Sequence, residues 1–103
     1  MIDWKEHLDP ARLKEANFCL AEFWATWCIY SRLLRPKTRR LAEYYENRVL
    51  VGRVEAEGNS DVLQALGIEF LPAVVFIERG RAIHKWYGDV PLQAITTVVN
   101  RHV

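Results

Sequence analysis

Short apolar runs alternate with longer stretches that carry apolar residues at helical spacing along this chain of 103 residues. Runs that are apolar, β-branched or aromatic and are bounded by polar residues predict buried strands. Four such runs are residues 18–24, 48–55, 73–78 and 81–87. Only Arg79 and Gly80 separate the last two runs, which predicts a β-hairpin at that point.

A short helix is predicted within the first 17 residues. Asp9 is suited to the N-cap and Pro10 to the first helical position, and good helix formers follow them as far as Ala16. Leu8 and Leu13 would then face the core. The pattern leaves open whether a strand precedes this helix.

A long helix is predicted from Cys28 to about Asn47. Four residues at helical spacing give it a buried stripe: Leu34, Thr38, Leu41 and Tyr45. Pro36 falls inside this helix and should kink it, because proline lacks the backbone N–H and its ring crowds the preceding turn.

Two further helices are predicted in the second half of the chain. Asn59 or Ser60 can cap a short helix that ends near Leu66, and Gly67 is suited to stop it. The last helix should begin at residues 89–91. Its apolar face is formed by Leu92, Ile95, Val98 and Val99.

The order of these elements predicts an α/β fold. Helical crossovers connect the early strands and make them parallel, whereas the hairpin is antiparallel. We expect one domain over residues 1–103, with a central mixed β-sheet flanked by helices on both faces.

Charge and composition argue against several classes of protein. The formal net charge is +1, which gives no general preference for nucleic acid or a membrane surface. No apolar run approaches the roughly 18 residues needed to cross a bilayer, and the charged start lacks the apolar core of a signal peptide. We therefore expect a cytoplasmic protein, acting as a monomer. One predicted helix carries a run of basic residues: Arg32, Arg35, Lys37, Arg39 and Arg40. We expect this run to form a solvated helix face. The alternative is that it binds acidic partners.

The two cysteines are expected to differ. Cys19 lies in the middle of a predicted strand, as a small buried hydrophobe. Cys28 lies where that strand has ended and a helix begins, and the free N–H groups and dipole of a helix start favour a thiolate. An extended chain from Cys19 to Trp24 spans roughly 16 Å, which argues against a disulfide because bridged Cα atoms lie within about 7 Å. Two cysteines and scattered histidines are too few for a metal site.

Residues 22–31 read E-F-W-A-T-W-C-I-Y-S. This frame resembles the thioredoxin family, in which a strand ending D-F-W-A precedes the active site W-C-G-P-C. The similarity runs from Cys19 to Gly88 without gaps, and the first 17 residues match poorly. Further positions at which the family has proline or glycine are Pro36, Gly67, Pro72, Gly80 and Gly88. The resemblance implies a thioredoxin-like fold and thiol–disulfide exchange with protein disulfides through Cys28, with no bound cofactor.

One departure from the family changes the expected chemistry. Ser31 occupies the position of the second cysteine, which in the family attacks the mixed disulfide and releases the substrate. A serine hydroxyl cannot form that disulfide, so exchange should begin at Cys28 and stall until an external thiol or reductase arrives. Three interpretations stay open: a natural monothiol protein, an engineered Cys-to-Ser trap of a dithiol enzyme, or a redox-inactive module that binds proteins through the same surface.

Glu22 stands where the family carries a buried aspartate, which the resemblance implies serves proton transfer with the second cysteine. A lone carboxylate in an apolar strand should be desolvated, which raises its pKa. The alternative is a glutamate on a half-exposed strand end.

The remaining candidate residues are expected to hold the substrate. Leu71 and Pro72 match the family's cis-proline loop, which the resemblance places beside Cys28 and pairs with the substrate backbone. Ile29 and Tyr30 replace the glycine and proline of the family motif and should reshape the surface around the thiol. An apolar rim that binds extended protein segments could be formed by Trp24, Trp27, Tyr30 and Phe70.

Overall fold

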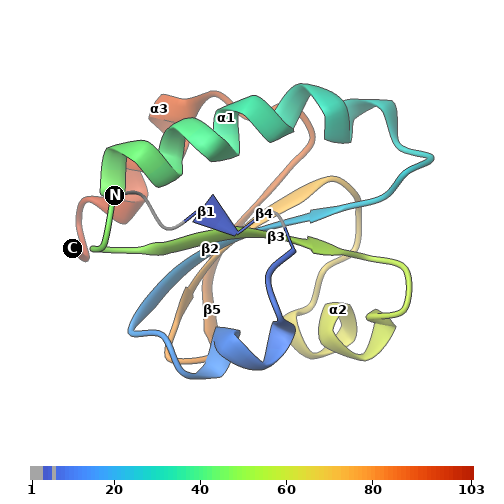
Figure 1. The fold of residues 1–103 in the computed structure, drawn as a ribbon, viewed down its shortest axis with the longest axis horizontal. Coiled ribbons are helices and arrows are strands. Elements are labelled where there is room, and N and C mark those ends of the chain that lie inside the picture. The colour runs from blue at the N-terminus through green and yellow to red at the C-terminus, as the bar shows by residue number, and fades with distance from the viewer. Residues whose placement is uncertain (1–3, 6) are drawn as a thin grey trace.

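The computed structural model describes residues 4–5 and 7–103 and shows a five-stranded sheet between two layers of helices (Figure 1). The strands are β1 Trp4–Lys5, β2 Phe18–Trp24, β3 Leu50–Glu55, β4 Ala73–Glu78 and β5 Arg81–Tyr87. Their order in the sheet is β1-β3-β2-β4-β5. β3 pairs parallel with β1 and β2, whereas β4 pairs antiparallel with β2 and β5. The predicted mixed sheet is confirmed.

Helices cover both faces of this sheet. They are the 3-10 helix η1 Pro10–Lys14 and the α-helices α1 Ile29–Tyr45, α2 Ser60–Leu66 and α3 Leu92–Val99. α1 and α3 lie on one face, and η1 and α2 lie on the other (Figure 1). Apolar side chains of successive β2 residues therefore enter two separate cores, as Leu20 packs in the cluster of α1 and α3 while Cys19 and Ala21 pack in the cluster of η1 and α2.

Most predicted boundaries agree with the structure. β2, β4 and β5 occupy the predicted ranges. α1 ends at Tyr45, before the predicted Asn47, because Glu46 adopts a positive φ of 49° and interrupts the helix. The turn continues through a hydrogen bond from the N–H of Arg48 to the Tyr45 carbonyl, 2.9 Å long, so β3 begins at Leu50 and not at Arg48.

The strand left open at the start of the chain exists. β1 pairs with β3, with Trp4 opposite Val51. The predicted helix after it is a 3-10 helix, whose N-cap Asp9 accepts a hydrogen bond from the N–H of Ala11 at 3.0 Å. In the β4–β5 turn, φ is 50° at Arg79 and 84° at Gly80, the pair of positive values that a tight two-residue hairpin requires.

Candidate functional site

Cys28 lies at the corner between β2 and α1. β2 ends at Trp24, and the N–H of Cys28 donates to the Ala25 carbonyl at 3.2 Å, which turns the chain. Cys28 is then the N-cap of α1. The corner lies at the right-hand edge of the molecule in Figure 1. The strand-to-helix position predicted for this thiol is thus the observed one.

The loop that precedes β4 lies against the thiol. The Sγ of Cys28 is 3.8 Å from the carbonyl oxygen of Leu71, which can accept the S–H hydrogen. The Leu71–Pro72 peptide bond is cis. The Pro72 carbonyl accepts a hydrogen bond from the N–H of Gly88 at 2.9 Å, which ties this loop to the end of β5. The structure therefore brings Cys28, Leu71 and Pro72 together from distant parts of the sequence.

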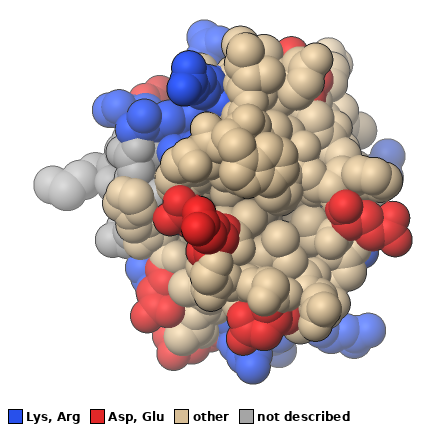
Figure 2. Space-filling model, turned by 90° about the vertical axis from the view of Figure 1, so that its right-hand side faces the viewer, with Lys and Arg blue, Asp and Glu red and all other residues tan. Residues whose placement is uncertain are grey.

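A groove with mostly apolar walls lies next to the corner that holds the thiol. Its volume is about 430 Å³, and it is lined by Trp27, Leu63, Ile68, Glu69, Phe70 and Leu71. Trp27 is 74 % exposed, Phe70 64 %, Ile29 69 % and Tyr30 55 %. Figure 2 looks onto this edge of the molecule and shows uncharged side chains over most of its middle, with single acidic groups around them. We call the groove with Ile29 and Tyr30 the apolar surface.

The opposite side of the corner is basic. A cleft of about 330 Å³ lies there, and its walls include His7, Trp24, Ser31, Arg32, Arg35 and Arg53. We call it the arginine cleft. Ser31 is only 2 % exposed, and its Oγ accepts a hydrogen bond from the N–H of Ala25 at 3.4 Å. Four of the basic residues on α1 are exposed, whereas Lys37 is half-buried and pairs with Asp89.

Trp24 does not belong to the predicted apolar rim, and this part of the prediction was wrong. Its side chain is half-buried and lines the arginine cleft, with the guanidinium of Arg53 4.6 Å above the ring. The indole Nε1 is buried and has no hydrogen-bond partner within residues 4–5 and 7–103. Residues Trp27, Tyr30 and Phe70 of the predicted rim are exposed near the thiol.

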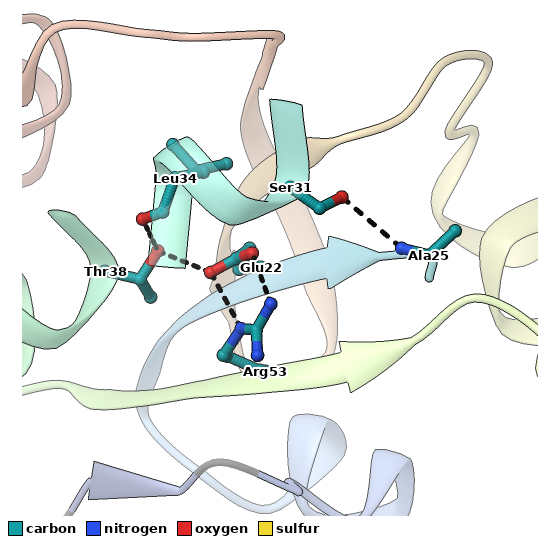
Figure 3. A network of polar contacts seen from close by, with 6 residues as sticks. All are labelled: Glu22, Ala25, Ser31, Leu34, Thr38 and Arg53. Atoms are coloured by element: carbon teal, nitrogen blue, oxygen red, sulfur yellow. Dashed lines mark hydrogen bonds and ion pairs between the residues drawn. The ribbon is translucent and has the colours of Figure 1, made fainter. Parts of the chain in front are cut away.

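Glu22 is fully buried and is held by two other side chains (Figure 3). Arg53 donates from Nε to Oε1 and from a terminal nitrogen to Oε2, each at 3.2 Å. The hydroxyl of Thr38 lies 2.7 Å from Oε1 and 3.1 Å from the Leu34 carbonyl. Burial raises the pKa of Glu22, although the hydrogen bonds from Arg53 and Thr38 and the charge of Arg53 act in the opposite direction. The prediction of a desolvated carboxylate therefore holds, and the half-exposed alternative does not.

The two side chains that bind Glu22 were not predicted from the sequence. Arg53 is a single charged residue inside the apolar run of β3, and Thr38 is the one polar member of the apolar stripe of α1. Both were visible as polar residues at buried positions, which proteins normally pair with one another. Their common partner became evident only with the strand register, which sets Glu22 opposite Arg53.

Cys19, the other cysteine of the chain, is shielded from reaction in this geometry. Cys19 is fully buried in β2, opposite Leu50 and Ile77 of the neighbouring strands. Burial raises its pKa to about 12, although the charge of Arg12 lowers it. Both cysteines are free thiols. The prediction that Cys19 is a small buried hydrophobe is confirmed.

Two negative findings apply to the described part of the chain. Within it, no cluster of three or more His, Cys, Asp or Glu residues could hold a metal ion. Nor does any described helix have the length and apolar character to cross a membrane.

Known proteins resemble this chain over nearly its whole length. Residues 3–101 match the family model described as Thioredoxin. A thioredoxin of Chlorobaculum thiosulfatiphilum is 26 % identical over 84 residues, which cover 82 % of this chain and 78 % of that protein. Thioredoxin 1 of Nostoc sp. is 27 % identical over the same shares of both chains. The solved structure of a mutant thioredoxin from Halobacterium salinarum superposes with a TM-score of 0.78 and 20 % identity, covering 96 % of this chain and 88 % of that one.

Proposed function

The chain belongs to the thioredoxin family of thiol–disulfide oxidoreductases, and from that premise we propose that it acts on protein disulfides through one thiol, Cys28. The observation that carries the proposal is the contrast between its two cysteines. Cys28 lies at the strand-to-helix corner beside an exposed apolar surface and keeps 8 % of its own surface exposed, whereas Cys19 is fully buried inside β2. The sequence contains no third cysteine.

The proposed reaction begins with attack by the Cys28 thiolate on one sulfur of the substrate disulfide. The S–S bond breaks, the other substrate sulfur leaves as a thiolate, and Cys28 is joined to the substrate in a mixed disulfide. Ser31 cannot displace it, so the mixed disulfide persists until an external thiol or reductase attacks. The chain is then a monothiol member of its family.

The apolar surface and the cis-proline loop are proposed to hold the substrate. An extended segment can pair its backbone with the Leu71–Pro72 loop, while Trp27, Ile29 and Tyr30 offer exposed apolar contacts beside the thiol. Glu22 is bonded to Arg53 and Thr38, and within the described chain no hydrogen bond joins it to Ser31. A part for Glu22 in proton transfer stays a prediction.

The test uses a neutral chromogenic substrate, dipyridyl disulfide, which releases thiopyridone when a thiolate attacks it. The native chain should release one thiopyridone per molecule and keep the other half bound to Cys28. The Ser31→Cys variant should release two per molecule and end without a label, because a thiol at position 31 displaces the second half. Cys28→Ser should release none, and Cys19→Ala should behave as the native chain. A native chain that ends unlabelled after releasing two would contradict the monothiol proposal.

A second function is favoured by the size of the apolar surface. Four large apolar side chains near the thiol are each more than half exposed: Trp27, Ile29, Tyr30 and Phe70. Such a surface can bind unfolded segments without any redox step. The test measures binding of a reduced, unfolded protein to Cys28→Ser, with Tyr44→Ala as an exposed aromatic control at the far end of α1. Binding that survives Cys28→Ser and is lost in Trp27→Ala supports this function, and binding lost in Cys28→Ser excludes it.

A further inference from the structure

β5 is the last strand in the sheet order, and two of its long side chains lie on the face that α2 covers. Lys85 is opposite Val75 of β4 and Tyr87 is opposite Ala73, and both of these β4 residues belong to the core on the face of η1 and α2. Residues that pair directly across two strands point to the same face of a sheet, so Lys85 and Tyr87 point to that face as well. They thereby reach the segment between α2 and β4, residues 67–72, which we call the groove loop.

Lys85 binds the end of α2. Its Nζ donates hydrogen bonds of 3.1 Å to the carbonyl oxygens of Leu66 and Gly67. Carbonyls in the last turn of a helix lack a partner within the helix, and a cation is favoured there because the helix dipole is negative at that end. The fit is close, because a Cβ at Gly67 would lie 2.9 Å from Nζ. Lys85 therefore ties the start of the groove loop to β5.

Tyr87 binds the middle of the groove loop. Its hydroxyl accepts a hydrogen bond from the N–H of Glu69 at 3.4 Å, and it can donate to the Gly67 carbonyl oxygen at 3.5 Å. Its ring packs edge-on against the ring of Phe70, with the two centroids 5.6 Å apart. Tyr87 therefore holds both the backbone of the loop and its exposed aromatic side chain.

The groove loop carries the groups that a protein substrate would contact. Phe70 and Leu71 line the groove, and the Leu71 carbonyl oxygen lies 3.8 Å from the Sγ of Cys28. Glu69 and Phe70 are exposed, so packing in the core does not fix this part of the loop. The contacts with β5 do fix it, and the position of the loop relative to the thiol follows from them.

We propose that Lys85 and Tyr87 are positioning residues for the protein substrate. They hold the groove loop so that the Leu71 backbone and the Phe70 ring are in place beside Cys28 before an extended segment binds. A loop that is already held in its binding conformation loses less conformational entropy when the substrate pairs with it. The two residues therefore strengthen substrate binding and leave the attack by the thiolate unchanged. The proposal rests on the monothiol function above and adds two residues of β5 that act through the loop.

The test compares two substrates that both release thiopyridone when the Cys28 thiolate attacks. One is dipyridyl disulfide, which has no peptide backbone to pair with the groove loop. The other is an uncharged, blocked alanine hexapeptide with one cysteine between two phenylalanines, and that cysteine carries thiopyridine. The peptide sulfur becomes joined to Cys28, and thiopyridone leaves. With the peptide in excess, the rates at several concentrations give a maximal rate and a half-saturating concentration.

Two variants weaken the hold on the groove loop to different degrees. Lys85→Met should raise the half-saturating peptide concentration about tenfold, as expected for the loss of charged hydrogen bonds to the loop. Tyr87→Phe keeps the ring and loses only the hydroxyl, so the expected rise is about threefold. In both variants the maximal rate with the peptide and the rate with dipyridyl disulfide should equal those of the native chain, because the thiol is not altered.

Arg81→Met is the matched control. It removes one exposed cation from the same strand, at the end that pairs with Glu78 and away from the groove loop. Both rates and the half-saturating peptide concentration should stay those of the native chain.

Three results would overturn the proposal. Equal slowing with both substrates would mean that Lys85 and Tyr87 only stabilise the fold. An unchanged half-saturating concentration would mean that the loop keeps its position without them, and equal effects of Lys85→Met and Arg81→Met would trace to charge alone. If Lys85→Met does not fold, Tyr87→Phe decides by itself. A native chain that releases no thiopyridone from dipyridyl disulfide would instead overturn the monothiol function, so the two failures are distinguishable.

Discussion

The interior of β2 and the corner that follows it place a cysteine in two different environments. Cys19, in the strand interior, has neighbours on both sides in the sheet, and burial raises its pKa to about 12. Cys28, nine residues later, is the N-cap residue of α1 and keeps 8 % of its surface exposed, and its Sγ lies 3.8 Å from the Leu71 carbonyl oxygen. Position within the secondary structure, and not residue type, separates an inert thiol from a candidate nucleophile.

The polar residues of the two regions differ in the same way. Glu22, in the strand interior, accepts hydrogen bonds from Arg53 on β3 and Thr38 on α1. The hydroxyl of Ser31, at the corner, accepts a long hydrogen bond of 3.4 Å, and the residue also lines an open cleft. The Glu22 carboxylate is thus held by three hydrogen bonds from two other elements, whereas the Ser31 hydroxyl makes one long hydrogen bond within its own corner.

The sharpest test of this comparison is thiol labelling, where the expected effect is complete. Iodoacetamide at pH 8 should modify Cys28 and leave Cys19 unmodified in the folded chain, because Cys19 is fully buried and its pKa is about 12. Mass spectrometry after proteolysis counts the labels. Cys28→Ser should take up none until denaturant is added. Labelling of Cys19 in the folded chain would mean that β2 opens readily, and the contrast would fail.

The second test breaks the buried pair of the strand interior. Arg53→Met should lower the free energy of unfolding by about 3–5 kcal/mol at neutral pH, because Glu22 would stay buried without a counter-charge. Since burial raises the pKa of Glu22, and more so without Arg53, the loss should be smallest below pH of about 4.3, where the unfolded carboxyl is also protonated. It should grow as the pH rises through the folded pKa of Glu22. Urea unfolding at several pH values measures it.

An exposed pair of the same type is the matched control. Arg39 and Glu43 lie 4.0 Å apart on the surface of α1. Arg39→Met should change the free energy of unfolding by no more than about 0.5 kcal/mol, because exposed ion pairs contribute little. If Arg39→Met and Arg53→Met lowered the free energy of unfolding equally, the buried Glu22–Arg53 pair would contribute no more to stability than an exposed pair.

The third test, whose expected effect is smaller than that of Arg53→Met, is the pH dependence that Cys19 adds to stability. Its pKa is raised in the folded chain, so its contribution is complete below the unfolded value of about 8.5 and is lost as the pH rises toward 12. Between pH 8.5 and 10 the unfolded thiol ionises while the folded one does not, which costs about 2 kcal/mol. The difference in unfolding free energy between the native chain and Cys19→Ala should shrink by that amount, or reverse, over this interval. A constant difference would mean that Cys19 is not shielded from solvent.

Much of the fold was predictable from the sequence because its signals are local. The ranges of β2, β4 and β5 follow from apolar runs and from the Arg79-Gly80 turn. β1 was not predictable, since two residues carry no pattern and it exists only through its pairing with β3. The end of α1 was predicted at about Asn47, too late in the sequence. The residues around Glu46 carry no pattern that predicts its positive φ.

The residues of the candidate site likewise include some that the sequence predicted and some that it did not. Cys28 and Ser31 could be named from the sequence, because they share one helical turn and a recognisable frame. Trp24 was misplaced, since its ring turns toward Arg53 on a neighbouring strand. The arginine cleft was not predicted either, because its walls come from the start of the chain, β2, α1 and β3.

The sequence by itself determined the order of the strands and helices after β1, the two kinds of cysteine environment and the absence of a second thiol at position 31. These depend on apolar spacing and on residue identity, which are local properties. The proximity of Leu71 to Cys28 was implied by the family resemblance, and the residue pattern alone did not predict it. Only the tertiary structure decided that Glu22 is paired with Arg53 and that an apolar groove and a basic cleft border the corner of Cys28. Such contacts join residues 31 and 43 positions apart. They are set by strand register and helix packing, which bring together residues whose neighbours in the sequence carry no sign of the partner.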